Sequence, residues 1–97
     1  MFILAVYDVH GTEESDKKRL RKVAKICEKY GIRVQSSVFE INTTPKDYIS
    51  IKAELEKIIS AEDSIRFYKL PNNFSDNIEI IGKVNDIELK SDNTFIF

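Results

Sequence analysis

The chain contains one cysteine, one histidine and three glycines, and each scarcity excludes a class of site. The lone thiol, Cys27, cannot form an internal disulfide or a cysteine-rich zinc cluster. The glycines Gly11, Gly31 and Gly82 are far apart, so there is no glycine-rich loop for nucleotide phosphates. The one histidine, His10, falls in an expected turn, where an exposed loop residue is a simpler interpretation than a catalytic base.

Long hydrophobic runs are also absent. No segment approaches the roughly 18 apolar residues that a membrane-spanning helix requires. The apolar N-terminus does not match a signal peptide, because it lacks a basic first region and a small-residue cleavage site and soon reaches Asp8. We therefore expect a cytoplasmic protein with no membrane partner. A chain of 97 residues builds only a modest core, which dimerisation would enlarge.

Residues 2–9 form an apolar, β-branched run whose single charge, Asp8, comes near its end. The run predicts a central strand that is covered on both faces. A carboxylate at a strand end can reach a ligand without being buried, which makes Asp8 the first candidate for a catalytic residue. The alternative is that Asp8 accepts backbone hydrogen bonds in the turn at residues 10–12.

A helix is expected after this turn, with Thr12 or Ser15 as its N-cap and Gly31 as the left-handed residue that ends it. Its apolar residues recur with helical spacing and predict one buried side, on which we place Cys27. The residues expected on that side are Leu20, Val23, Ala24, Cys27 and Tyr30.

The same helix is strongly basic. Seven cations and one acid lie between Lys17 and Lys29, although the net charge of the chain is −1. Four lysines form a stripe opposite the apolar side, namely Lys18, Lys22, Lys25 and Lys29. Such a stripe suits an anionic partner such as nucleic acid. The alternative is a solvated outer face, and the sequence pI near 5.8 is below that of dedicated nucleic-acid-binding proteins.

The sequence after Gly31 predicts the remaining strands and the second helix. Residues 32–42 alternate like strand residues, as two short strands or as one long strand and part of a second. The segment Thr44-Pro45-Lys46-Asp47 is a helix start, and residues 65–70 read as a strand. The resulting order is that of an α+β fold, a ferredoxin-like βαββαβ sandwich with an antiparallel sheet. The second helix is expected to bury Tyr48, Ile51, Leu55, Ile58 and Ile59.

We expect residues 1–97 to form a single ferredoxin-like domain. Residues 78–81 read as an additional strand and the tail 95–97 is apolar, so 78–97 form a C-terminal extension beyond the minimal fold. A hydrophobic extension beside exposed sheet edges predicts pairing with the partner protomer of a homodimer. Packing onto its own domain is the alternative.

Four segments, in this order and in a chain of this length, resemble the Cas-two family of CRISPR-associated proteins, the smaller core subunit of spacer acquisition. They are Val6-Tyr7-Asp8-Val9, residues 19–23, residues 30–40 and residues 63–68. The resemblance implies a ferredoxin-like homodimer that acts on RNA or DNA in antiviral defence, with a larger CRISPR integrase subunit as a partner.

The resemblance also implies that Asp8 of each protomer contributes to one shared divalent-metal site. Mg²⁺ needs only one or two protein carboxylates, so a two-fold axis makes one aspartate per chain sufficient. Mn²⁺ suits the same oxygen ligands. We expect metal binding to compete with protons and to strengthen as the pH rises. A bound ion of this kind supports phosphodiester hydrolysis.

By the same resemblance, Arg19 and Arg33 match basic positions that bind phosphates, and Phe39 matches a residue that positions the dimer or the substrate. The alternatives are that Arg33 pairs with Glu40 across a hairpin and that Phe39 belongs to the core. The expected nucleic-acid-binding residues are Lys18, Arg19, Lys22, Lys25, Arg33 and Phe39.

Three functions follow as hypotheses. The first is a Mg²⁺-dependent endonuclease that acts through Asp8. The second is a non-catalytic dimer that holds DNA on its lysines and bridges copies of the larger subunit, for which Asp8 matters little. The third is a ferredoxin-like domain that binds a small ligand or an acyl phosphate, against which the scattered glycines count.

Overall fold

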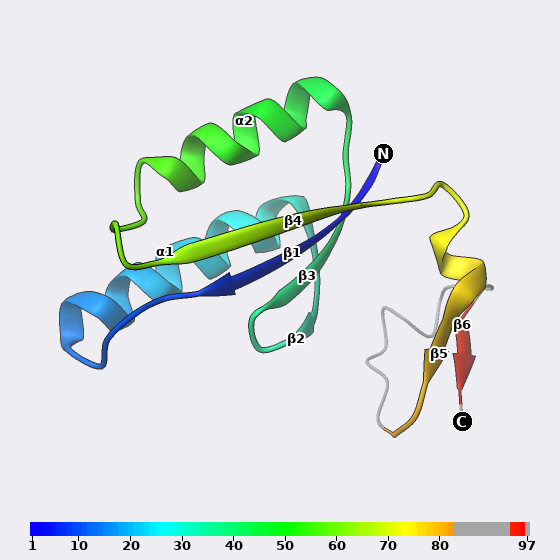
Figure 1. The fold of residues 1–97 in the computed structure, drawn as a ribbon, viewed down its shortest axis with the longest axis horizontal. Coiled ribbons are helices and arrows are strands. Elements are labelled where there is room, and N and C mark those ends of the chain that lie inside the picture. The colour runs from blue at the N-terminus through cyan, green and yellow to red at the C-terminus, as the bar shows by residue number, and fades with distance from the viewer. Residues whose placement is uncertain (83–93, 97) are drawn as a thin grey trace.

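The computed structural model describes residues 1–82 and the backbone of residues 94–96 (Figure 1). The βαββαβ order of the first six elements confirms the predicted α+β, ferredoxin-like fold. The elements are β1 (Phe2–Asp8), α1 (Glu14–Tyr30), β2 (Gly31–Gln35), β3 (Val38–Asn42), α2 (Pro45–Glu56), β4 (Ser64–Leu70), the 3₁₀ helix η1 (Phe74–Asn77), β5 (Ile78–Ile80) and β6 (Thr94–Ile96).

The main sheet is antiparallel, with the strand order β2-β3-β1-β4. Strand β1 is central, as its continuous apolar run predicted, but the helices of one chain cover only one of its two faces. Residues 32–42 form a hairpin of two strands, which decides between the two alternatives for that segment. Both helices pack on one face of the sheet, and α2 runs alongside α1 (Figure 1).

Strand alternation divides β1 between two environments. Ile3, Ala5 and Tyr7 are buried beneath the helices, whereas the residues between them point to the opposite surface, which we call the open face. Because directly opposed residues of antiparallel strands share a face, the register assigns its other members. The open face comprises Phe2, Leu4, Val6 and Asp8 of β1, Val38, Glu40 and Asn42 of β3, and Ser64, Arg66, Tyr68 and Leu70 of β4.

Helix α1 begins differently from the prediction. Its N-cap is Glu13, and neither Thr12 nor Ser15 caps it. Glu13 and Asp16 form a reciprocal capping box, in which Asp16 Oδ2 accepts the Glu13 N–H at 3.1 Å. Two acidic side chains thus cap the first turn of α1, where the sequence predicts the hydroxyl of Thr12 or Ser15.

The helix also ends differently. Gly31 is extended, with φ −153°, and is the first residue of β2 rather than a left-handed cap. A Cβ at this position would lie 2.5 Å from the carbonyl oxygen of Glu40 and 2.6 Å from Cγ1 of Ile41. The glycine therefore permits a close approach of β2 to β3.

The buried side of α1 is narrower than expected. Val23, Ala24 and Cys27 are buried, but Leu20 is 39 % exposed. Cys27 is a core residue as predicted, and burial raises the pKa of its thiol to about 11. This thiol is therefore protonated at neutral pH and unreactive.

Helix α2 follows the prediction closely. Thr44 Oγ1 accepts the Asp47 N–H at 3.1 Å and Pro45 occupies the first turn. Ile51 and Leu55 are buried. Tyr48 is partly buried against the same core. Ile58 and Ile59 are also partly buried, but they lie after the helix, which ends at Glu56. Among the described residues, neither helix is long and apolar enough to cross a membrane.

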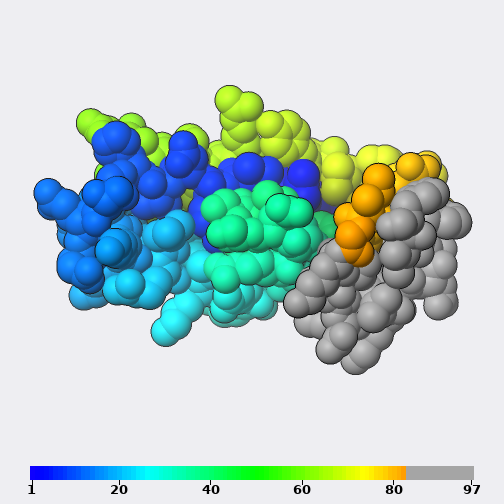
Figure 2. Space-filling model, turned by 90° about the horizontal axis from the view of Figure 1, so that it is seen from below, coloured from blue at the N-terminus to red at the C-terminus, as the bar shows by residue number. Residues whose placement is uncertain are grey.

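Residues 78–81 of the C-terminal extension lie beside the β2–β3 hairpin (Figure 2). The strand predicted near residue 78 is confirmed as β5, which pairs in parallel with β6 of the same chain. Pairing with a partner protomer stays a prediction, and residues 83–93 and 97 of the extension lie outside the described residues.

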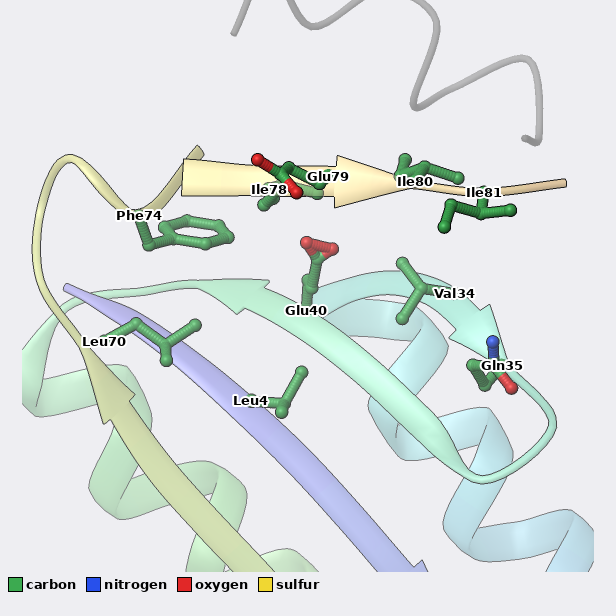
Figure 3. Close-up of a pocket in the computed structure, with 10 residues that line it drawn as sticks. All are labelled: Leu4, Val34, Gln35, Glu40, Leu70, Phe74, Ile78, Glu79, Ile80 and Ile81. Atoms are coloured by element: carbon green, nitrogen blue, oxygen red, sulfur yellow. The ribbon is translucent and has the colours of Figure 1, made fainter. Parts of the chain in front are cut away.

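A groove separates β5 from the open face. Figure 3 shows Leu4, Glu40 and Leu70 rising from the sheet towards β5. The ring of Phe74 closes one end, with its centroid 4.6 Å from that of Phe2. The groove is lined by Leu4, Val34, Gln35, Glu40, Leu70, Phe74, Ile78, Glu79, Ile80 and Ile81.

Candidate active site

Asp8 is the last residue of β1, where its exposed side chain belongs to the open face opposite Ser64. Within residues 1–82, no hydrogen bond or ion pair to its carboxylate is found. The alternative that Asp8 accepts hydrogen bonds from the following turn is therefore not realised. The Asp8 side chain is exposed, so its carboxylate can receive a ligand.

A different carboxylate holds that turn. Asp63, which directly precedes β4, accepts the backbone N–H of His10 at 2.9 Å and that of Ser60 at 2.8 Å. The His10 side chain is exposed, with Nε2 3.0 Å from the Glu62 carboxylate. The loop that follows Asp8 is thus tied to the loop that precedes β4.

Arg19 completes this arrangement. Its Nε donates to Asp63 Oδ2 at 2.6 Å, and its Nη2 donates to Asp63 Oδ1, Asp16 Oδ1 and the His10 carbonyl at 3.1–3.2 Å. The Asp63 side chain is 0 % exposed and that of Arg19 is 17 % exposed. The Arg19 hydrogen bond holds the pKa of Asp63 well below its usual range. We call Arg19, Asp16 and Asp63 the Arg19 cluster.

The cluster changes the interpretation of Arg19. The family resemblance implied a phosphate contact, but the structure directs the guanidinium inward. There it joins α1 to the loop after Asp8 and to the loop before Ser64. Two carboxylates outweigh the single positive charge of this guanidinium, so the cluster has a formal net charge of −1 and does not attract a phosphate. In this structure Arg19 positions the loops.

Phe39 is a core residue, which is the alternative that the sequence left open. Its ring is 0 % exposed beneath the helices, which leaves no face on which a base could stack. Arg33 lies over this ring, 5.3 Å from its centroid, and forms an ion pair with Glu28 at 3.7 Å. Arg33 faces Phe39 in the strand register, whereas Glu40 faces Ile32.

The lysine stripe lies on the outer side of α1, with all four side chains exposed. Lys29 Nζ pairs with Glu54 of α2 at 3.0 Å. No ion pair to Lys18, Lys22 or Lys25 is found within the part of the chain that the structure describes. These three lysines, unlike Arg19 and Phe39, are placed where an anionic partner can reach them.

Residues 1–82 of one chain offer few ligands that lie together for a metal ion. Among residues 1–82, no group of three or more histidine, cysteine, aspartate or glutamate side chains is close enough to hold one. Asp8 nevertheless suits a hard divalent cation, because its carboxylate oxygens are exposed and have no described protein partner. A second copy of the chain would double the carboxylates available.

Sequence reasoning did not single out Arg66, which shares the open face with Asp8. The alternation of residues 64–70 indicates that Arg66 shares a face of its strand with Ser64 and Tyr68. That this face is also the face of Asp8 becomes known only from the pairing of β4 with β1.

The family model described as CRISPR associated protein Cas2 matches residues 1–78. The chain belongs to the Cas2 family. This result confirms the resemblance found in the sequence and accounts for the ferredoxin-like order of the elements that the structure describes.

Individual members of the Cas2 family are similar over most of the chain. The "CRISPR-associated endonuclease Cas2" of Halalkalibacterium halodurans is 45 % identical over 91 residues, which cover 93 % of this chain and 95 % of that protein. The "CRISPR-associated endoribonuclease Cas2 3" of Rhodospirillum rubrum is 43 % identical over 88 residues, covering 90 % of this chain and 93 % of that protein.

A solved structure shows the same fold. The crystal structure of Streptococcus pyogenes Cas2 at pH 6.5 matches with a TM-score of 0.78 and 47 % sequence identity. The match covers 84 % of this chain and 100 % of that chain.

Proposed function

We propose that this protein is a metal-dependent endonuclease that hydrolyses phosphodiester bonds of nucleic acid in CRISPR spacer acquisition. The observation that carries the proposal is Asp8, an exposed carboxylate at the end of the central strand with no described partner. The names of the Cas2 relatives, endonuclease and endoribonuclease, support the reaction class.

The proposed active unit is a homodimer in which the open faces bring two Asp8 carboxylates together. A divalent ion such as Mg²⁺ or Mn²⁺ takes oxygen ligands and keeps several waters, so two carboxylates are sufficient. Association is favoured by the apolar side chains of the open face, including Leu4, Val6 and Leu70, which one chain leaves only half-buried.

When bound, a divalent ion supplies charge stabilisation for the phosphate and activates water. Asp8 would hold this ion, and its carboxylate must be deprotonated to do so, which makes ion binding weaker at low pH. The Arg19 cluster would fix the loop after Asp8 through the bond from His10 N–H to Asp63. This support limits the orientations that the carboxylate at the strand end can take.

Removal of divalent ions is expected to stop cleavage. Labelled RNA, single-stranded DNA and duplex DNA oligonucleotides would be incubated with the protein after dialysis against EDTA, and product would be followed on denaturing gels. We expect no product in EDTA and full recovery with excess Mg²⁺ or Mn²⁺, because Asp8 acts through the ion. EDTA already saturated with Mg²⁺ is the control and must not inhibit. Cleavage that continues in metal-free EDTA would refute the proposal.

The exposed lysines favour a second function, in which the dimer binds duplex DNA without cutting it and bridges copies of the larger integrase subunit. Lys18, Lys22 and Lys25 lie on one helix side, exposed and with no ion pair to another described residue. Lysines in a row along a helix can follow a phosphate backbone. Asp8 has no part in this function, so the two functions are separable.

Salt dependence tests the lysine contact. If three lysines of each protomer neutralise one phosphate apiece, log K should fall with log salt with a slope of about −5. Replacing both Lys18 and Lys22 by glutamine should reduce the slope to about −2. Fluorescence anisotropy between about 50 and 200 mM salt measures it. The control removes Lys46 and Lys57 of the α2 side; equal slopes for the two double variants would exclude the α1 stripe.

A further inference from the structure

A second charged side chain shares the open face with Asp8. Strand β4 is antiparallel to β1, with Ser64 opposite Asp8 and Arg66 opposite Val6. Opposed residues of antiparallel strands point to the same face, so Arg66 is one cross-strand row from Asp8. Among the side chains that the described strands place on the open face, Arg66 is the one cation.

The guanidinium of Arg66 is exposed and has a neutral partner. Its Nη1 donates a hydrogen bond to the Tyr68 hydroxyl at 3.3 Å, and Tyr68 is the next residue of β4 on the same face, 46 % exposed. No carboxylate among the described residues forms an ion pair with it. Arg19 and Arg33, by contrast, are both paired with acids.

The surroundings of Arg66 strengthen its interaction with an anion. Val6 lies directly opposite Arg66 and Leu4 lies opposite Tyr68, so the β1 side chains on one side of Arg66 are apolar, whereas Asp8 lies on the other side. Charge interactions beside apolar surface are screened less than those in bulk water. An arginine held by a tyrosine hydroxyl also loses less conformational freedom on binding than a free one.

We propose that Arg66 binds the scissile phosphate beside Asp8. This inference rests on the proposed endonuclease function and adds the side chain that recognises the phosphodiester. With one N–H directed to Tyr68, the guanidinium keeps four donors, enough for a bidentate contact to the non-bridging oxygens.

The chemical role of Arg66 is electrostatic. In the hydrolysis, water forms a bond to phosphorus and the bond to the leaving oxygen breaks, while a proton from the water passes to that oxygen. Arg66 keeps its own protons throughout. Negative charge on the phosphate oxygens increases as the water attacks, and a fixed cation stabilises that charge.

The test compares Arg66→Ala and Arg66→Lys with Lys46→Ala, which removes an exposed cation from the start of α2 on the helix side. We expect kcat/KM for a short oligonucleotide to fall about 100-fold in Arg66→Ala. The kcat/KM of Arg66→Lys should lie between those of Arg66→Ala and wild type, because lysine keeps the positive charge but cannot make the bidentate contact of a guanidinium. Lys46→Ala should equal wild type.

Three further measurements separate a phosphate contact from a structural one. Thermal unfolding, sedimentation equilibrium and Mn²⁺ binding by electron paramagnetic resonance should be the same in Arg66→Ala and wild type. Oligonucleotide affinity in Ca²⁺, which supports binding without turnover, should fall several-fold.

The inference is overturned if Arg66→Ala matches Lys46→Ala in both kcat/KM and Ca²⁺-dependent affinity. It is also overturned if the loss of activity accompanies dissociation of the dimer and disappears at high protein concentration, since Arg66 would then be a contact between copies. Failure of the proposed function has a different signature, namely wild-type cleavage no faster than that of Asp8→Asn. In that case the Ca²⁺-dependent affinity alone decides whether Arg66 binds phosphate.

Discussion

Replacing Asp8 by asparagine is expected to lower metal-dependent cleavage on the order of 1,000-fold and to leave the fold unchanged. The substitution keeps the size of the side chain and removes its charge, so each dimer loses both anionic ligands at once. Stability should be unaffected, because the exposed carboxylate makes no hydrogen bond or ion pair to another described residue. Initial rates with Mg²⁺, together with thermal unfolding, measure the two effects.

Glu56→Gln is the matched control, since it removes one exposed acid from the end of α2 on the helix side. It should cleave at the wild-type rate. Equal activity of Asp8→Asn and Glu56→Gln would refute a catalytic role for Asp8.

A shared site can be told from two independent sites by mixing protomers. If wild-type and Asp8→Asn chains exchange freely at equal concentrations, about a quarter of the dimers carry two intact carboxylates. A shared site then retains about a quarter of the wild-type activity, whereas independent sites retain about half. Retention of half the activity would leave Asp8 catalytic but disprove the shared ion.

Asp63→Asn is expected to destabilise the protein by about 2 kcal/mol, because Arg19 and two backbone N–H groups lose a charged acceptor. The Asp63 side chain is 0 % exposed and accepts bonds from Arg19, His10 N–H and Ser60 N–H. An amide has no charge for Arg19 and one acceptor oxygen instead of two. Urea unfolding at fixed protein concentration measures the loss.

Glu62→Gln is the control for Asp63→Asn. Glu62 is adjacent in sequence but 70 % exposed, and it pairs with an exposed His10 ring, so its removal should change stability by less than about 0.5 kcal/mol. Equal stability of the two variants would show that the Arg19 cluster contributes little to the fold.

The hydrogen-bonded pair of Arg19 and Asp63 also predicts how the free energy of unfolding depends on pH. Hydrogen bonding to Arg19 lowers the pKa of Asp63 in the folded protein, so its contribution is complete above the unfolded pKa of about 3.9. The contribution is lost as the pH falls through the lower, folded pKa. Between about pH 5 and 2, the free energy of unfolding should therefore fall less steeply in Asp63→Asn than in wild type. Parallel curves would contradict the pKa shift.

Asp8 and Asp63 are therefore expected to affect different properties, activity for Asp8 and stability for Asp63, although they lie at the same end of the sheet. Asp63 directly precedes Ser64, the residue opposite Asp8. Its side chain is nevertheless shielded from solvent and accepts hydrogen bonds from Arg19 and from the backbone of two loops. Asp8 has no such partners among the described residues. Loss of activity without loss of stability in one variant, and loss of stability in the other, would establish the distinction.

The sequence alone determined the order of the elements, the start of α2 and the position of the catalytic candidate. The hydrophobic periods of strands and helices are local, and so is the Thr44-Pro45 start with its cap to Asp47. Asp8 was found because one charge interrupts an apolar strand. These features depend on neighbours within a few residues, which a sequence displays directly.

The tertiary structure decided which cations are paired with acids and which lie exposed on the same face as Asp8. Arg19 and Asp63 are 44 positions apart, and nothing local to either indicates that they pair. Gly31 is extended because β2 passes close to β3, and Phe39 is buried because its face of β3 meets the helices. Arg66 joined the candidate site only when the register of β4 against β1 placed it on the same face as Asp8. The packing of distant segments sets such contacts, and short-range patterns do not encode it.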